Sequence, residues 1–473
     1  MPPNSGAGAK QGEYLPLLSW KGWRSKQVLL IVLVLLGFGL RIGYGVARYR
    51  GQLNLSRDGF VGFWDYDALE HVLIAKALLS GKGYVVDDTR PANGKHADYS
   101  GQEALFKAPL YEFFLAGCFS ISGFSFKLFF PLQALLGGFT AGLVGQITWQ
   151  SFERIDAAWL AGISVALHPI LVNSASQPYN ENLFFFLFAA SIMSFLLWLG
   201  SLDTIWALIC GASTGLCMLT RENGLLLLVS AGAIVLIFRS HRLRTWLGYG
   251  LIVVTAFGVV APWTLRNYER FGVFVPVASI MGEDLNEGNN ECVAKEGMLV
   301  PYWAEGRCAA VDEQRRNLAQ TMAFDPRTPA AVRDDRISRR VALDFIAAHP
   351  GSYAKLVFRR LWTTLLPFDP RGDQGLTERI ALSIYWVGLY PAGICGALLL
   401  TGRLDAPRAL LILLGIVNLL SMAAVLYWSD LRFRVAIDIP LACLAGFAYS
   451  ELFWGAGLWG HKVGSSGASF RRT

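Results

Sequence analysis

The chain has 473 residues, of which 53% are hydrophobic and only 16% are charged, and its formal net charge is +7. Soluble domains contain about 25% charged residues, so an ordinary soluble protein is excluded. The high hydrophobic content also excludes a disordered chain. The counts of 49 glycines and seven cysteines exclude a collagen-like and a disulfide-scaffold protein. A polytopic membrane protein remains, in which the excess of Lys and Arg marks loops on one membrane face and not a nucleic-acid-binding surface.

Ten apolar stretches along the chain are long enough to cross a bilayer, which takes about 20 residues in a helix. They lie at residues 28–47, 128–149, 157–172, 183–199, 203–220, 223–238, 245–262, 379–401, 407–427 and 433–454. The sequence therefore predicts an all-α integral membrane protein, a polytopic bundle of about ten crossing helices. Arg41 and aromatic residues follow the first stretch in place of a small-residue cleavage site, so we expect an uncleaved anchor and not a signal peptide.

Basic clusters give the expected orientation, because loops rich in Lys and Arg stay in the cytoplasm. There are four such clusters: one before the first apolar stretch, one at residues 239–244, one at residues 403–408 and one in the tail at residues 461–472. Two clusters lie on the same side of the membrane only if an even number of crossing helices separates them. This holds for every consecutive pair of clusters only if a shorter apolar piece at residues 110–124 does not cross. We therefore expect this piece to form a re-entrant or juxtamembrane helix on the outer, periplasmic side of an inner (plasma) membrane.

This topology divides the chain into five parts. They are a cytoplasmic tail at residues 1–27, a membrane module at 28–262 that includes a first outer loop at 48–109, a large outer loop at 263–378, C-terminal membrane helices at 379–454 and a cytoplasmic tail at 455–473. Within the large outer loop, residues 334–349 show helical periodicity, and residues 353–366 are amphipathic and basic, which suits a membrane surface. Cys292 and Cys308 share this loop, and because the outer compartment is oxidising we expect a disulfide between them.

The first outer loop places carboxylates where a helix begins. Asp67 is either the N-cap of that helix or a general base that takes a proton from an acceptor hydroxyl. Asp65 and Asp67 also form an Asp-x-Asp pattern of the kind that binds divalent metals, with Glu181 as a further candidate ligand, although three-residue patterns are common and we favour no metal. His71 lies on the same helix and is a further candidate for contact with substrate.

Charged residues also stand at helix ends on the expected outer side. The cations are Lys107, Arg221 and Arg266, and the sequence Asn180-Glu181 adds an amide and a carboxylate. Each of them alone is an ordinary interfacial anchor. Together with Asp67 on one membrane face, they predict a site for a lipid phosphate and its attached group.

Short motifs follow one another along most of the chain. They are Asp67-Ala-Leu-Glu70, Gly81-Lys-Gly-Tyr84, Lys107-Ala-Pro-Leu-Tyr111, Leu132-Gln-Ala-Leu-Leu136, His168-Pro169, Asn180-Glu181, Leu219-Thr-Arg221, Pro262-Trp-Thr-Leu-Arg-Asn-Tyr268, Phe271-Gly-Val-Phe-Val-Pro276, Gly288-Asn-Asn290 and Arg432-Phe-Arg434. In this order they resemble the GT-C glycosyltransferases, especially the branch of the protein O-mannosyltransferases and the lipid A aminoarabinose transferase. The chain has His71 where that family often has an aromatic residue.

The resemblance implies an integral membrane enzyme that transfers a sugar from a polyprenyl-phosphate donor to a hydroxyl of a lipid, glycan or protein acceptor on the outer face, with inversion at the anomeric carbon. Asp67 matches the catalytic acidic residue of the family and Lys107 its donor-phosphate contact. Arg221 and Arg266 occupy family-like positions, and their positive charge would stabilise the leaving phosphate. No cofactor is implied, and the expected partners are the donor, the acceptor and membrane lipids, without nucleic acid.

A membrane transporter or lipid-linked sugar flippase is the alternative from another class. Transporters place ionisable residues near the bilayer midplane and often contain inverted repeats. Most charges here stand at helix ends instead, and the segment 263–378 is longer than a carrier needs. The sequence therefore favours the transferase.

Overall fold

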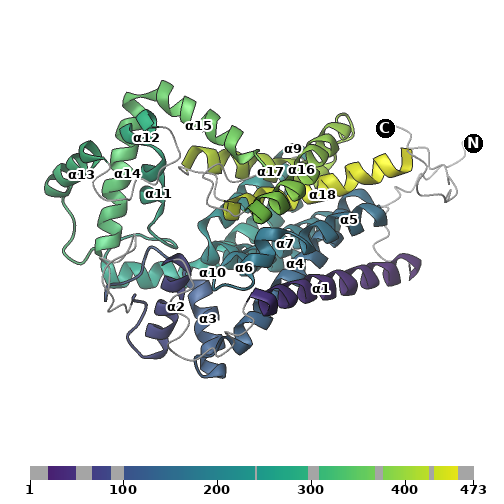
Figure 1. Ribbon diagram of the computed structural model, residues 1–473, viewed down its shortest axis with the longest axis horizontal. Coiled ribbons are helices and arrows are strands. Elements are labelled where there is room, and N and C mark those ends of the chain that lie inside the picture. The colour runs from purple at the N-terminus through teal and green to yellow at the C-terminus, as the bar shows by residue number, and fades with distance from the viewer. Residues whose placement is uncertain are drawn as a thin grey trace, which may run out of the picture.

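The computed structural model describes residues 20–48, 66–86, 101–239, 242–296, 308–367, 376–425 and 431–455, and this part of the chain is almost entirely helical (Figure 1). The bundle contains α1 (Trp20–Arg48), α4 (Phe126–Phe152), α5 (Ile155–Ala166), α6 (Pro169–Ser174), α7 (Glu181–Ser201), α8 (Thr204–Thr220), the 3-10 turn η2 (Glu222–Gly224), α9 (Leu225–Arg239), α10 (Leu243–Phe271), α16 (Leu376–Leu399), α17 (Ala406–Val425) and α18 (Leu431–Gly455). The other helices are α2 (Tyr66–Leu79), α3 (Pro109–Ser122), α11 (Met281–Gly288), α12 (Glu291–Glu296), α13 (Ala309–Thr321), α14 (Ala330–Ala348) and α15 (Pro350–Thr364).

The helices outside the bundle gather at one of its ends, opposite the end where α1 begins and α18 finishes (Figure 1). Contacts at the far end join the start of α1 to the last turns of α4, where the Gln146 side chain donates to the Lys26 carbonyl at 2.7 Å, and α5 to the end of α18 through an ion pair of Arg154 with Glu451. The short helices α2, α3 and α11–α15 therefore lie on the side opposite to both ends of the described chain.

Eight helical segments in the described residues are long and apolar enough to cross a membrane. They are Ser25–Arg48, Phe126–Phe152, Glu181–Ser201, Glu222–Arg239, Leu243–Phe271, Arg379–Leu399, Ala406–Val425 and Leu431–Phe453. The predicted all-α membrane bundle is confirmed. The count of ten crossings stays a prediction, because the stretches expected at 157–172 and 203–220 form apolar helices of only 12 and 17 residues, α5 and α8.

The stretch expected as one helix at 157–172 is broken into α5 and α6, and this corrects the prediction. Pro169 disfavours the helical region for the residue before it and cannot donate a backbone hydrogen bond. The break leaves carbonyls without helical partners inside the bundle, and the buried Arg41 of α1 donates to the carbonyls of Ala166 at 3.2 Å and Val165 at 3.3 Å. A buried cation thus compensates for the interrupted helix.

The elements of the outer loops largely follow the sequence pattern. The apolar piece at 110–124 forms the separate 14-residue helix α3, which starts at Pro109 and ends before Gly123 in the left-handed conformation, with φ of 65°. The periodic segments at 334–349 and 353–366 form α14 and α15. The expected division into domains, and the position of α3 and α15 relative to a bilayer, stay predictions.

Cys292 and Cys308 are joined in a disulfide, with 6.0 Å between their Cα atoms. The bond links α12 to the start of α13. Cys308 also packs with Val311 of α13 and Val341 of α14 in a small apolar cluster, which holds α13 against α14.

Candidate active site

The first two short helices form the scaffold of the candidate site. Helix α2 packs against α3, and between them the imidazole Nδ1 of His71 lies 2.7 Å from a carboxylate oxygen of Glu112, with both side chains buried. The ring of His71 also meets the ring of Tyr111 edge-on, with 4.8 Å between the centroids. His71, expected as a substrate contact, therefore faces α3 and holds α2 in place.

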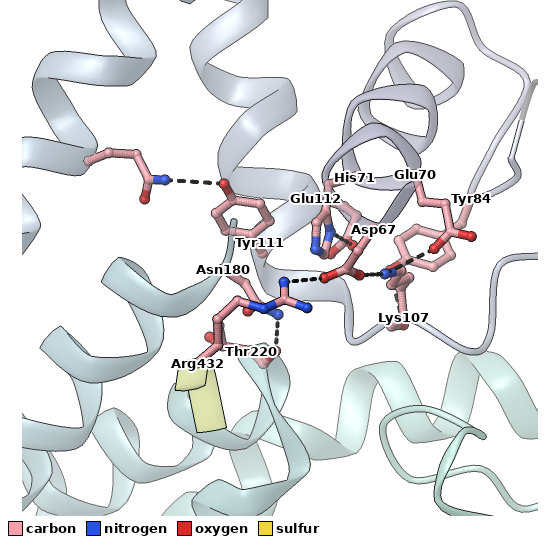
Figure 2. Close-up of polar contacts among 11 residues, drawn as sticks. Asp67, Glu70, His71, Tyr84, Lys107, Tyr111, Glu112, Asn180, Thr220 and Arg432 are labelled. Atoms are coloured by element: carbon pink, nitrogen blue, oxygen red, sulfur yellow. Dashed lines mark hydrogen bonds and ion pairs between the residues drawn. The ribbon is translucent and has the colours of Figure 1, made fainter. Parts of the chain in front are cut away.

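Asp67 lies in the first turn of α2, where the partial positive charge of a helix N-terminus favours a carboxylate. It contacts two cations from distant parts of the chain (Figure 2): Lys107 Nζ approaches Oδ1, and Arg432 Nη1 donates to Oδ2 at 2.8 Å. The Asp67 side chain is nonetheless 40% exposed. This carboxylate is thus both held by positive charge and open to a substrate.

Lys107 is positioned by the backbone just before α3. Its carbonyl accepts a hydrogen bond from the Tyr84 hydroxyl at 3.1 Å, and the following Ala108 is extended because Pro109 starts the helix. The Lys107 ammonium also lies 3.0 Å from a carboxylate oxygen of Glu70, which is one turn after Asp67 on α2 and is only 2% exposed. Lys107 therefore bridges the buried and the open carboxylate of the same helix.

Arg432 reaches Asp67 from the first turn of α18, 365 positions further along the chain. Its guanidinium lies over the ring of Tyr179, with 4.7 Å to the centroid. That ring covers one face of the guanidinium, and the N–H groups lie in the guanidinium plane, where Nη1 reaches the Asp67 carboxylate.

The charges around Asp67 decide its protonation. Burial acts to raise the pKa of Asp67, but attraction to Lys107 and then to Arg432 outweighs it and holds the pKa well below the ordinary value. Conversely, burial acts to lower the pKa of Lys107, and Asp67 and Glu70 raise it above its usual range. At neutral pH the Asp67 carboxylate is therefore ionised and the Lys107 amine is protonated.

Arg221, Glu181 and Asn180 lie at the same end of the bundle. Arg221 Nη1 donates to Glu181 Oε1 at 3.1 Å, and the guanidinium lies over the ring of Phe433, the residue after Arg432, at 4.8 Å. The Asn180 amide lies 3.5 Å from the Thr220 carbonyl (Figure 2). Arg221 thus adjoins the Arg432 segment, and Glu181 neutralises it.

Arg266 has different surroundings. Its guanidinium donates to Glu103 Oε2 at 2.8 Å and lies 4.8 Å from the ring of Trp263, which itself meets Tyr84 edge-on. Arg270 pairs with the other carboxylate oxygen of Glu103 at 2.7 Å. The structure therefore brings together Asp67 and Lys107, places Arg221 beside Phe433, the residue after Arg432, and pairs Arg266 with Glu103.

The metal-binding role of the Asp-x-Asp pattern and the expected absence of a metal both stay predictions. Asp65 lies outside the described residues. In the part of the chain that the structure describes, no group of three or more His, Cys, Asp or Glu could hold a metal ion.

Sequence reasoning missed three residues of this region: Arg432, Glu70 and Glu103. The signal for Arg432 was present, because Arg432-Phe-Arg434 is one of the ordered motifs, but its residues were not assigned to the site. Glu70 was read as part of a motif without a role. Glu103 carries no motif, and only the packing of the loop 101–108 against α10 reveals it.

Comparisons with known proteins agree with the sequence resemblance. Residues 106–265 match the family described as dolichyl-phosphate-mannose-protein mannosyltransferase. The structure is similar to that of the oligosaccharyltransferase AglB of Archaeoglobus fulgidus in complex with an inhibitory peptide and a dolichol-phosphate, with a TM-score of 0.56 at 15% identity. It is also similar to the crystal structure of an Archaeoglobus fulgidus oligosaccharyltransferase in the apo form, with a TM-score of 0.57 at 15% identity. Each similarity covers 93% of this chain and 52% of the other chain.

A third similar structure is ArnT of Cupriavidus metallidurans bound to undecaprenyl phosphate, with a TM-score of 0.41, 13% identity, and coverage of 93% of this chain and 80% of that one. A search of curated protein sequences finds no match. The chain spans about half the length of AglB. The predicted resemblance to the GT-C glycosyltransferases is confirmed, and the chain is a multi-pass integral membrane protein.

Proposed function

We propose that this protein transfers a sugar from a polyprenyl-phosphate-linked donor to a hydroxyl of a lipid, glycan or protein acceptor, on the periplasmic or outer face of the inner membrane. The observation that carries the proposal is the arrangement of Asp67 between Lys107 and Arg432. A half-open carboxylate and two cations, from three distant segments, meet at the end of a membrane bundle. Such a set suits a lipid phosphate with a sugar attached.

The family match supports the same conclusion from independent evidence. The matched segment, residues 106–265, includes Lys107, Glu181 and Arg221. Asp67 and Arg432 lie outside it and contact it, Asp67 through Lys107 and Arg432 through the ring of Tyr179. The two cations that contact Asp67 thus come from inside and from outside the segment that carries the family resemblance.

In the proposed reaction, Asp67 removes the proton of the acceptor hydroxyl as its oxygen attacks the anomeric carbon. The bond from that carbon to the phosphate oxygen breaks on the opposite face, so the configuration inverts, and the polyprenyl phosphate leaves with the bonding electrons. Lys107 and Arg432 stabilise its growing negative charge. The proton passes from Asp67 to water and restores the carboxylate.

The low pKa of Asp67 fits this role once the donor is considered. A carboxylate neutralised by two cations is a weak base. When the donor phosphate takes over part of the positive charge of Lys107 and Arg432, the attraction that lowers the pKa of Asp67 decreases and its basicity rises. Donor binding would therefore activate the base.

A lipid-linked sugar flippase is the second candidate, because ionisable residues also lie inside the bundle. His168 Nε2 and Asp438 Oδ2 are 3.0 Å apart and buried, and Trp386 donates to the same oxygen at 3.0 Å. Buried ionisable groups in membrane segments often mark transport pathways. Asp438, however, is fixed by these two partners at the break between α5 and α6.

The test is to incubate the purified protein in lipid nanodiscs with a panel of undecaprenyl-phosphate sugars and hydroxyl acceptors, and to follow donor and product by mass spectrometry. Conversion of one donor to undecaprenyl phosphate with a glycosylated acceptor is the expected result. The same donors in proteoliposomes report flipping. Movement of intact donor between leaflets, with no glycosylated product from any donor, would replace the transferase with the flippase.

A further inference from the structure

Arg432 lies at the start of α18, soon after the connection from α17. The helices α11 and α15 contact the end of α17, and α15 also contacts the start of α18. Helix α17 ends at Val425 and α18 begins at Leu431. Helix α15 lies beside the end of α17 (Figure 1). The contacts of α15 therefore bear on where Arg432 is held.

The end of α17 is capped by side chains from the outer helices. The last carbonyls of a helix have no partner within it. Here Arg360 Nη1 donates to the Ala423 carbonyl at 3.0 Å, and the Tyr353 hydroxyl donates to that of Ala424 at 3.4 Å. The Asn289 amide lies 3.4 Å from the carbonyls of Ala424 and Val425.

Arg360 joins this helix end to a second one. Its guanidinium also donates to the Gly288 carbonyl at the end of α11 and to Asn289 Oδ1, the latter at 3.1 Å, and the side chain is only 1% exposed. Burial lowers the pKa of Arg360 to about 10, so the group stays charged at neutral pH. A cation at two helix C-termini is favourable, because both carry partial negative charge.

The start of α18 is tied to the same helix α15. Arg434 donates through Nη1 to the Leu366 carbonyl at 2.6 Å and through Nη2 to the Thr363 carbonyl at 3.1 Å. The hydroxyls of Thr363 and Thr364 in turn donate to the Arg360 carbonyl, at 3.1 and 2.8 Å. One turn of α15 therefore connects the end of α17, through Arg360, with the first turn of α18, through Arg434.

We propose that Arg360 is a positioning residue of the transferase: it fixes the end of α17 to α11 and α15 and thereby holds Arg432 against Asp67. The inference rests on the proposed function, because it gives Arg432 its role at the donor phosphate. It also explains the motif Gly288-Asn-Asn290, which the site itself does not use, and the second arginine of Arg432-Phe-Arg434, because both belong to this capping network. The outer helices thus control the geometry of a site that they do not enter.

The main variant is Arg360→Met, with Arg359→Met as the matched control, because Arg359 is the exposed neighbour on the same helix. We expect R360M to lower kcat/KM between tenfold and a hundredfold, the range for a small displacement of a catalytic group. The acidic limb of the pH profile of kcat/KM should move to higher pH, because Asp67 loses the nearby charge of Arg432 and its pKa rises. R359M should leave both unchanged.

A double-variant cycle with Arg432→Met separates positioning from general damage. If Arg360 acts through Arg432, R360M has little further effect on kcat/KM in the R432M background. Full additivity, or an acidic limb that R360M leaves in place, would overturn the inference. If R360M does not fold, Tyr353→Phe, which removes one hydroxyl from the same cap, should move the limb in the same direction by a smaller amount, and no movement would count against the inference equally.

Melting temperatures of the four proteins of the cycle, measured in nanodiscs, provide a readout that needs no donor. Non-additive shifts support a physical link between Arg360 and Arg432 even if no sugar is transferred, and only the proposed function then fails. Transfer by the wild type together with additive melting shifts and an unmoved limb refutes the positioning role and leaves the function standing.

Discussion

Asp67→Asn tests two roles of one carboxylate: that of the general base, and that of the anion with which the donor phosphate competes for Lys107 and Arg432. Asparagine has nearly the same shape, so it removes the negative charge and the basicity while keeping the volume. Lys107 retains Glu70 as a buried partner at 3.0 Å, so the loss of Asp67 does not leave the ammonium without an anion. We therefore expect the variant to fold and insert as the wild type does.

The two roles predict effects of opposite sign. Loss of a general base lowers kcat by about 10²- to 10⁴-fold. In the free enzyme, however, Asp67 also competes with phosphate for Lys107 and Arg432. Two like charges about 5 Å apart repel by roughly 3 kcal/mol at an effective dielectric constant of 20. Because the Asp67 side chain is 40% exposed, about half of this remains after solvent screening, which corresponds to roughly tenfold tighter binding of a polyprenyl phosphate.

The assay pairs transfer kinetics with binding of undecaprenyl phosphate, measured by isothermal titration in nanodiscs. Asp344→Asn, on the exposed face of α14 and paired with Arg340, is the matched control and should change neither quantity. A variant D67N that keeps kcat within tenfold of the wild type would remove Asp67 as the base. Weaker binding of undecaprenyl phosphate would refute the competition between carboxylate and phosphate.

Three further predictions concern the charge, the disulfide and the topology. Lys107→Met should move the acidic limb of kcat/KM to higher pH, because Asp67 works only above its pKa and loses the cation that lowers that pKa most; an unmoved pH profile would contradict this. Cys292→Ser should destabilise the outer helices by about 3 kcal/mol, since the disulfide closes a loop of 16 residues, and hydrogen exchange in α12 and α13 should rise. Single cysteines at the exposed positions Glu153 and Glu269, in a background without the exposed native cysteine, should react with impermeant maleimide from opposite sides of the membrane; labelling of both from one side would contradict the topology.

The helical bundle was predictable because apolar runs report burial in lipid directly. Sequence alone gave approximate helix positions and the short helix α3, whose Pro109 start and Gly123 end are local signals. It failed at 157–172, where mean apolarity hid Pro169. Apolarity is summed over a window, whereas a helix is broken by one residue.

The site was predictable where neighbours in sequence share a scaffold, and not where partners come together only through packing. Asp67 and Lys107 were recognised from ordered motifs, and α2 and α3 bring them into contact. The partner Arg432 lies 365 positions from Asp67, and no periodicity relates them. For Arg266, the positive charge was evident in the sequence, but its neutralisation by Glu103 depends on a tertiary contact.

Charge balance links these observations to the mechanism. Each expected cation is already paired: Lys107 with Asp67, Arg221 with Glu181, and Arg266 with Glu103. The carboxylates of Glu181 and Glu103 are 2% and 10% exposed, whereas that of Asp67 is 40% exposed. An arriving phosphate can therefore displace Asp67 from its cations at the smallest desolvation cost, because only this anion can turn toward water. The same displacement frees the carboxylate that must act as base, so the place where the donor binds and the group that it activates follow from one difference in exposure.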